Sequence, residues 1–124
     1  PALNLHIPSS GPLTKELCED SFQRAKSFFC EEGKETVFLC DSWLLFPRHR
    51  EILSPESGIC RFMDLFTLIE CHEQPEFFDA WRVFGKEVHP PYEDLRQDTA
   101  LQRGYARWLK AGEATATGVG IAIR

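Results

Sequence analysis

The sequence predicts an α/β fold, in which strands alternate with helices along the chain. Two short apolar runs, at residues 3–7 and 36–40, have the composition of β-strands. Between them apolar residues recur at helical spacing, and the same alternation continues toward the C-terminus. The 124 residues, 43% of them hydrophobic, are enough for one core of reasonable size. We therefore expect a single domain over residues 1–124, built from packed layers of helix and sheet.

The first third of the chain is expected to form a strand, a helix and a second strand. The strand over residues 3–7 ends at Pro8, and the Thr14 hydroxyl is placed to cap the helix that follows. Gly33 is expected to end that helix. Its predicted buried face consists of Leu13, Leu17, Phe22, Ala25, Phe28 and Phe29. The continuous apolar run over 36–40 is typical of a central strand that is buried on both faces of a parallel sheet.

The middle of the chain is expected to form a second helix and a third strand. Ser54, Pro55 and Glu56 have the order of an N-cap followed by the first two helical positions. The apolar residues behind them follow helical spacing and are Ile59, Phe62, Met63 and Phe66. The third strand is predicted over residues 67–71.

The sequence pattern over residues 75–112 predicts two further helices before the last strand. The first is expected to open at Pro75 and to close at Gly85. Its predicted inner face consists of Phe77, Phe78, Trp81 and Phe84. The second is expected to begin at Asp94 or Asp98 and to end before Gly112, and the alternating run over 118–124 predicts the closing strand.

The charge and the cysteine pattern exclude several classes of protein. Fourteen Lys and Arg stand against 19 Asp and Glu, so the formal net charge is −5. Nucleic acid and anionic membranes attract clustered basic residues, so neither is an expected partner. The five cysteines form no CxxC pair, and we expect them to be reduced in a cytoplasmic protein. The four histidines have no i, i+3 or i, i+4 pair, so we expect no metal site.

The unit of strand, small polar loop and helix at residues 3–17 is the first candidate site. Free N–H groups and the dipole at a helix N-terminus attract phosphate, and a loop containing Ser9, Ser10 and Gly11 lets the backbone approach it. Lys15 would attract an anion there. An ordinary capped connection between strand and helix fits the same residues.

Polar residues on the strands are the second group of candidates. Asp41 and Ser42 follow the second strand at its carboxyl end, where ligands bind in open α/β sheets. They could act on a substrate, or they could cap local backbone N–H groups in a turn. His6 could serve as a general base or as a hydrogen-bonded structural residue. Cys71 and His72 have the types of a nucleophile and a base, but adjacent strand residues point to opposite faces.

Three segments, LNLHIPSSGPLTKELCEDSFQRAKSFF, TVFLCDSWLLFP and SPESGICRFMDLFTLIE, resemble the C-terminal half of a GNAT-like N-acyltransferase. The resemblance is to the branch in which this half is a separate C-terminal domain, and it covers residues 3–70 and, more loosely, 118–124. It implies a GNAT-like half-fold with a mixed sheet of about four strands flanked by helices. Residues 75–112 would then be a helical insertion before the last strand.

The resemblance also implies a co-substrate and roles for particular residues. Acetyl-CoA or another acyl-CoA would lie along the first strand, with its pyrophosphate at the start of the first helix. The implied cofactor-binding set is Leu5, Ile7, Ser9, Ser10, Gly11, Leu13 and Thr14. The implied catalytic set is His6, Asp41 and Ser42: His6 would lie on the strand that pairs with the pantetheine amides, and Asp41 and Ser42, together with Trp43, would lie near the thioester.

The implied activity is the direct transfer of an acyl group, expected to be acetyl, to a small-molecule or peptide amine. Because the chain starts at Pro1 without Met, we expect an N-terminal part of the same protein to complete the enzyme. A non-catalytic interaction or regulatory domain that keeps the scaffold is the alternative. Its motivation is that residues 55–65 lack the Tyr that many members use as general acid, and offer only Ser57 and Cys60. A thiol hydrolase using Cys71 or Cys60 is a third class.

Overall fold

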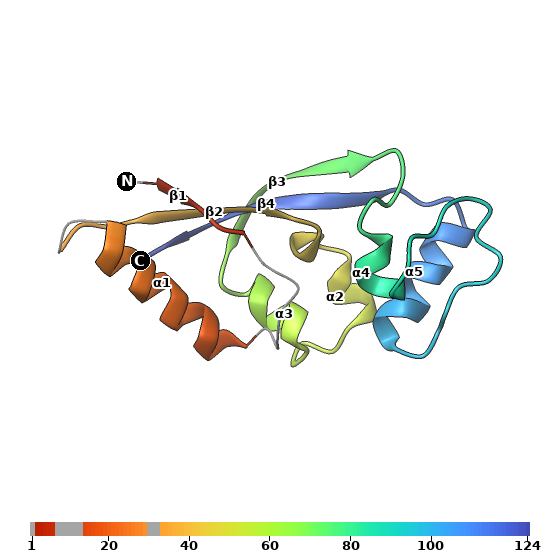
Figure 1. Ribbon diagram of the computed structural model, residues 1–124, viewed down its shortest axis with the longest axis horizontal. Helices are drawn as coiled ribbons and strands as arrows, with labels where there is room; N and C mark the ends of the chain where they lie inside the picture. Colours follow the sequence, from red (N-terminus) through yellow and green to blue (C-terminus); the bar gives the residue numbers. More distant parts are fainter. Residues whose placement is uncertain (1, 7–13, 30–32) are drawn as a thin grey trace.

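The computed structural model describes residues 2–6, 14–29 and 33–124, and it contains a four-stranded mixed sheet with helices gathered on one face (Figure 1). In chain order the elements are β1 (Ala2–Asn4), α1 (Lys15–Phe29), β2 (Val37–Ser42), the 3-10 helix η1 (Trp43–Leu45), α2 (His49–Ile52), α3 (Gly58–Met63), β3 (Thr67–Gln74), α4 (Ala80–Phe84), α5 (Ala100–Lys110) and β4 (Thr115–Ile123). The predicted α/β alternation is confirmed, and η1 and α2 are additions to it. Within the described ranges no helix is long and apolar enough to cross a membrane.

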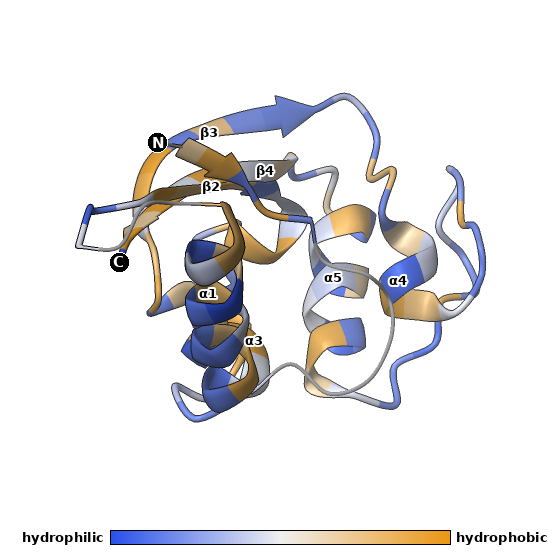
Figure 2. Ribbon diagram, turned by 60° about the vertical axis from the view of Figure 1, so that its left-hand side comes forward, coloured by the Kyte–Doolittle hydropathy of each residue, from blue (hydrophilic) through white to orange (hydrophobic). Residues whose placement is uncertain are grey.

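The strand order of the sheet is β1-β2-β4-β3, so β2 lies centrally as predicted. It pairs in parallel with β1 and antiparallel with β4, and β3 pairs antiparallel with β4. The expectation that β2 is buried on both faces is wrong: Phe38 and Cys40 are buried, whereas Leu39 between them is only half-buried. The reason is that the helices cover one face of the sheet alone (Figure 2).

Helix α1 is capped as predicted, but its buried face is narrower than the sequence indicates. The Leu17 N–H donates to Thr14 Oγ1 over 3.2 Å. Phe22 is buried, whereas Leu17, Phe28 and Phe29 are 54%, 81% and 66% exposed. Successive residues turn by about 100° around a helix, so Leu17 and Phe28 lie on a different side from Phe22. The predicted Leu13 lies outside the described residues.

Helix α3 begins three residues later than predicted. The Ser57 hydroxyl accepts from the Cys60 N–H over 3.2 Å and caps the helix, which starts at Gly58. Ser54 instead accepts from the Glu56 N–H over 3.2 Å, in a turn before the helix. Both serines have the chemistry of an N-cap, and only the path of the chain decides between them.

Helix α4 is shorter than predicted and buries only part of its aromatic face. It begins at Ala80 instead of Pro75 and ends, as predicted, at Gly85 with φ +77°. Phe77 and Phe84 are buried as predicted. Phe78 and Trp81 are 62% and 42% exposed, so their assignment to the core is wrong. Phe78 precedes the helix, and Trp81 lies on a different side of it from the buried Ala80, Val83 and Phe84.

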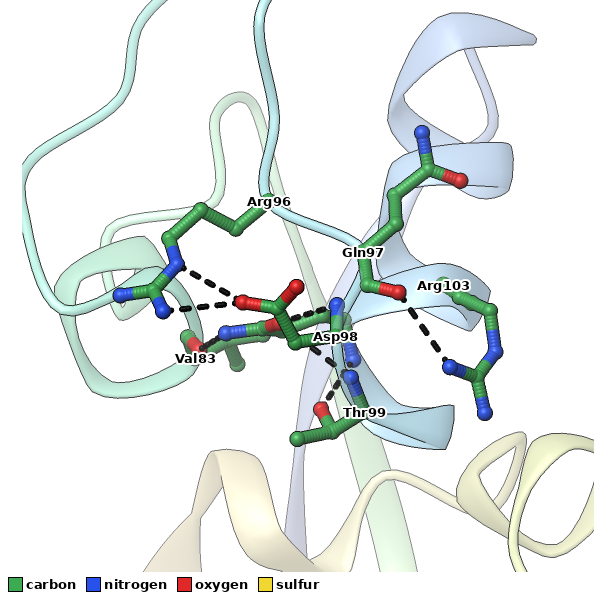
Figure 3. Close-up of polar contacts among 7 residues, drawn as sticks. Val83, Arg96, Gln97, Asp98, Thr99 and Arg103 are labelled. Carbon is green, nitrogen blue, oxygen red and sulfur yellow. Dashed lines mark hydrogen bonds and ion pairs between the residues drawn. The ribbon is translucent and has the colours of Figure 1, made fainter.

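Helix α5 is held to α4 by a network around Gln102 (Figure 3). The Gln102 side chain donates from Nε2 to the Val83 carbonyl over 3.1 Å and accepts from the Asp98 N–H over 2.8 Å. Thr99 is the N-cap: its hydroxyl accepts from the Gln102 N–H over 3.1 Å, which completes a capping box. The predicted end before Gly112, at φ +74°, is also observed.

Replacing Thr99 with alanine should lower the free energy of unfolding by about 1 kcal/mol, the usual cost of a lost N-cap. The variant leaves the Gln102 N–H without its partner at the start of α5. Urea denaturation followed by circular dichroism measures the change. Gln97→Ala is the matched control, because only its backbone carbonyl is used, as acceptor from Arg103. An equal loss in both variants would contradict the capping role.

The core beneath the sheet is rich in aromatic residues and contains one buried histidine. Phe77 stacks on Tyr105 with ring centroids 4.4 Å apart, and Trp43 and Trp108 contact the same tyrosine. His49 is fully buried among them, 2.6 Å from the Tyr105 hydroxyl through Nε2 and 3.2 Å from the Leu44 carbonyl through Nδ1. Because a carbonyl only accepts, Nδ1 carries the proton and Nε2 accepts from Tyr105.

Candidate functional site

The candidate site begins where strands β1 and β2 separate. Their parallel register ends at Asn4 and Leu39, and one further bond joins the Leu5 N–H to the Leu39 carbonyl over 2.8 Å. Strand β2 continues to Ser42, paired with β4 on its other side. Figure 1 shows the short strand β1 beside β2. The edge of β2 that faces β1 is therefore uncovered by strand pairing beyond Leu39 among the described residues.

The backbone of Asp41 lies on this uncovered edge. Peptide groups along a strand point alternately to its two neighbours, and the Leu39 carbonyl points to β1. Asp41 has the same parity as Leu39, so its N–H and C=O also point toward the β1 side. No described residue there is bonded to them. Sequence reasoning considered the Asp41 side chain and missed these backbone groups, although the parity of positions 39 and 41 is a signal that could have found them.

The side chains of His6 and Asp41 lie on the same, helix-free face of the sheet. Leu3 and Leu5 pack against the core, so His6 alternates to the opposite side. Asp41 follows the half-buried Leu39 on that side, and both candidates are exposed. Within the described part of the chain neither side chain has a hydrogen-bond or ion-pair partner. The structure thus brings two predicted catalytic residues to one face without joining them.

The Ser42 hydroxyl has a local structural role. It accepts from the Leu44 N–H over 3.1 Å and caps η1. The turn interpretation that the sequence left open is therefore confirmed for Ser42. The cap turns the chain from β2 into η1 directly after Ser42, so Asp41 is the last residue of β2 on the uncovered edge.

Of the predicted cofactor-binding residues, the structure describes Leu5 and Thr14. Leu5 makes the last bond between β1 and β2, and Thr14 caps α1. Lys15 and Glu16 lie in the first turn of that helix. The others lie outside the described residues: Ile7, Ser9, Ser10, Gly11 and Leu13. The described ends of this segment are therefore the separation point of the strands and the N-terminus of a 15-residue helix.

The thiols do not form a nucleophilic site in the described residues. Burial raises the pKa of the Cys71 thiol, and His72 lies 3.1 Å from Glu70 through Nε2 instead of contacting Cys71. Cys60 is fully buried, and its backbone N–H is the group that Ser57 caps. A thiolate is the reactive form of cysteine, so these surroundings oppose nucleophilic catalysis. The two candidates for a general acid are also unavailable: Cys60 is fully buried, and the Ser57 hydroxyl is used as the N-cap of α3.

Comparisons with known proteins relate the chain to acyltransferases. Among solved structures it is similar to an acyltransferase in complex with decanoyl-CoA and teicoplanin, with TM-score 0.78 and 29% identity over 97% of this chain and 40% of that one. A complex with CoA and 10C-teicoplanin matches with TM-score 0.77 and 29% identity over 96% and 39%. A complex with decanoyl-CoA matches with TM-score 0.74 and 31% identity over 97% and 39%. Curated protein sequences include no match.

The chain spans about two fifths of the length of these acyltransferases. The family model of the GNAT-like C-terminal domain matches residues 1–122, which is nearly the whole sequence. The mixed four-stranded sheet flanked by helices agrees with this match. The protein therefore belongs to the family of GNAT-like C-terminal domains.

Proposed function

We propose that this chain is the acyl-CoA-binding part of an N-acyltransferase. The observation that supports the proposal most directly is the uncovered edge of β2 at Asp41, next to the point where β1 leaves the sheet. An extended ligand with amide groups can pair with such an edge as an added strand does. The pantetheine arm of CoA has two amides and is a ligand of this kind. The membership in the GNAT-like family and the acyl-CoA complexes of similar structures point the same way.

The phosphates of the co-substrate are proposed to bind at the N-terminus of α1. Unpaired N–H groups and the helix dipole favour anions there, and Lys15 adds a positive charge. The proposed cofactor-binding residues are those implied by the resemblance: Leu5, Ile7, Ser9, Ser10, Gly11, Leu13 and Thr14. Thr14 would contribute by holding the first turn of the helix in place.

The proposed reaction is direct attack of an amine on the thioester carbonyl. His6 or Asp41 takes a proton from the ammonium form of the acceptor, and the freed lone pair forms the C–N bond. A backbone N–H at the separated strands stabilises the oxyanion. The nitrogen of the tetrahedral intermediate gives up its second proton to solvent, collapse breaks the C–S bond, and the CoA thiolate leaves and takes up a proton from solvent. Ser42 caps η1 and would position Asp41 in this scheme.

The proposal also covers the identity of the acyl group, the kind of acceptor and an N-terminal part of the same protein. Octanoyl- and decanoyl-CoA are bound by similar acyltransferases, which widens the expected acyl group beyond acetyl. The complex of a similar acyltransferase with teicoplanin supports an acceptor that bears an amine. An N-terminal part of the same protein is proposed to complete the site, since the similar acyltransferases are longer than this chain. A cytoplasmic location is proposed with it, and the free thiols of Cys18, Cys40, Cys60 and Cys71 support this location.

Isothermal titration of the 124-residue chain with octanoyl-CoA and acetyl-CoA tests the binding proposal. Lys15→Gln should weaken binding about fivefold, because it removes a charge beside the proposed phosphate site. Lys26→Gln is the matched control: it removes the same charge from the last turn of the same helix and should leave the affinity unchanged. Absence of binding by a folded sample, or equal effects of both variants, would contradict the proposal.

A non-catalytic interaction domain that keeps the scaffold is the second candidate. One observation favours it: Ser57 is engaged as a helix cap and Cys60 is fully buried, so neither is placed to protonate the leaving thiolate. The two candidate functions can be distinguished by measuring the turnover of octanoyl-CoA by the full-length protein in the presence of an amine. Thiol release that depends on the amine supports the enzyme, and binding without release supports the interaction domain.

A further inference from the structure

Helix α1 presents a partly apolar stripe on the side that faces away from the sheet. Leu17 is 54% exposed and Phe28 is 81% exposed, which are high values for large apolar side chains in a folded protein. Asp20 and Arg24 lie between them along the same side and form an ion pair of 2.9 Å, with side chains 55% and 81% exposed. At 100° per residue these four positions fall within about a third of a turn around the helix. Because all four side chains are more than half exposed, no other described element covers this side of α1.

The stripe is self-complementary when read in opposite directions. Two copies of α1 laid antiparallel about a two-fold axis, near residues 22 and 23, bring Leu17 of one copy opposite Phe28 of the other. The same operation brings Arg24 of one copy beside Asp20 of the other, twice. Two apolar contacts therefore flank a central set of four alternating charges, which is the arrangement that an isologous interface requires.

The surface beside Phe28 has room for the opposing leucine. A shallow hollow of about 390 Å³ is lined by Gln23, Arg24, Ser27 and Phe28. Phe28 is held at its margin by an edge-on contact with Phe29, whose ring centroid is 4.7 Å away. An apolar side chain from an antiparallel partner helix would reach this hollow, and its burial would remove both Leu17 and Phe28 from water.

We propose that α1 is a homodimer interface, formed by antiparallel packing of this stripe against a second copy of the chain. The occupant is a second copy because the apolar ends and the central charges match themselves under the two-fold operation. One 15-residue helix offers less area than a standard interface, so the dimer is weak and forms at high micromolar concentration. The proposal does not depend on acyl transfer.

Sedimentation equilibrium of the 124-residue chain, over about 10 to about 500 µM, measures the association that an interface of this size allows. The mean mass is expected to rise with concentration from the 14.2 kDa of one chain toward that of a dimer. Phe28→Glu should raise the dissociation constant at least about tenfold, since it buries a charge in the contact. Phe78→Glu, an equally drastic change at a residue on the α4 side that is 62% exposed, is the control and should leave it unchanged.

A charge exchange tests the antiparallel register separately. Arg24→Glu places like charges opposite each other in the dimer. It should raise the dissociation constant by about threefold or more, which is the size of effect expected from losing an exposed ion pair. Asp20→Arg combined with Arg24→Glu restores opposite charges both within and between copies, and should restore association. Circular dichroism verifies that each variant is folded. A chain that stays monomeric at the highest concentration, or a double variant as weak as Arg24→Glu alone, overturns the proposal.

Discussion

Replacement of Gly118 by alanine is expected to lower the free energy of unfolding by about 3 kcal/mol, at the upper end of the usual cost of overpacking. A Cβ atom at Gly118 in β4 would lie 2.4 Å from the Leu45 carbonyl oxygen and 2.8 Å from its carbonyl carbon. Both atoms belong to the backbone of η1, which cannot rotate away as a side chain can. The element would have to move away from the sheet and take its buried side chains with it. Urea unfolding of the two proteins measures the difference.

Gly104→Ala is the matched comparison for this prediction. Its Cβ would also lie 2.4 Å from a neighbour, but every close atom belongs to the Ile52 side chain. Rotation of that side chain relieves the contacts with Cδ1 and Cγ2 but not the 2.8 Å contact with Cβ, so this variant should also lose stability, although less than Gly118→Ala. The second substitution of Ile52 by alanine should recover part of the loss. Equal losses at positions 104 and 118 would show that the backbone contact of Leu45 is not decisive.

Stability is expected to fall as the pH drops from about 6.5 to about 4, because of His49. Burial lowers the pKa of this imidazole from 6.5 to about 4, although its bond to the Leu44 carbonyl acts in the opposite direction. In this interval His49 binds a proton in the unfolded chain but not in the folded chain, so a lower pH favours unfolding. The contribution is fully present above pH 6.5, and its loss amounts to about 3 kcal/mol when the pH has fallen through the folded pKa. Urea midpoints measured at several pH values give the slope.

A variant without the imidazole isolates this effect from other titrating groups. His49→Gln should have a lower stability at pH 7 and a much flatter pH dependence between 4 and 6.5. His72→Gln is the control, since that imidazole is exposed and bonded only to Glu70, and it should keep the slope of the parent. Glu76 raises the pKa of His89, which places the titration of that residue above this interval. If His49→Gln retains the steep slope, the assignment to His49 is wrong.

The fold could be predicted from the sequence where only one nearby residue is chemically suited to begin or end an element. Thr14 is the residue before α1 with a capping hydroxyl, and Gly85 and Gly112 adopt the positive φ angles that favour glycine. The alternation of apolar strands and amphipathic helices identified the layered sheet. Such features depend on residues within one or two turns of each other, and these are visible in a linear pattern.

The predictions failed where the environment of a side chain comes from distant parts of the chain. Phe22 and Phe28 are both phenylalanines in the apolar pattern of α1, yet Phe22 is 1% exposed and Phe28 is 81% exposed. Which of them faces the sheet depends on how α1 is oriented over β2, not on the helix itself. The same reason explains the exposed Trp81 and the unpredicted burial of His49, which is satisfied by Tyr105, 56 positions further along the chain.

For the candidate site, the sequence by itself determined the family resemblance, the capped helix after the first strand and the choice of His6 and Asp41. Only the tertiary structure decided that these two side chains share the helix-free face and that Ser42 is a cap. It also decided that the Asp41 backbone lies on an edge that β1 leaves uncovered. Residue types and spacing determine which local bonds can form, whereas strand register and packing determine which backbone groups are left without a partner. Within the described residues the Asp41 N–H and C=O are such groups, and they are the ones that the proposed co-substrate would bind.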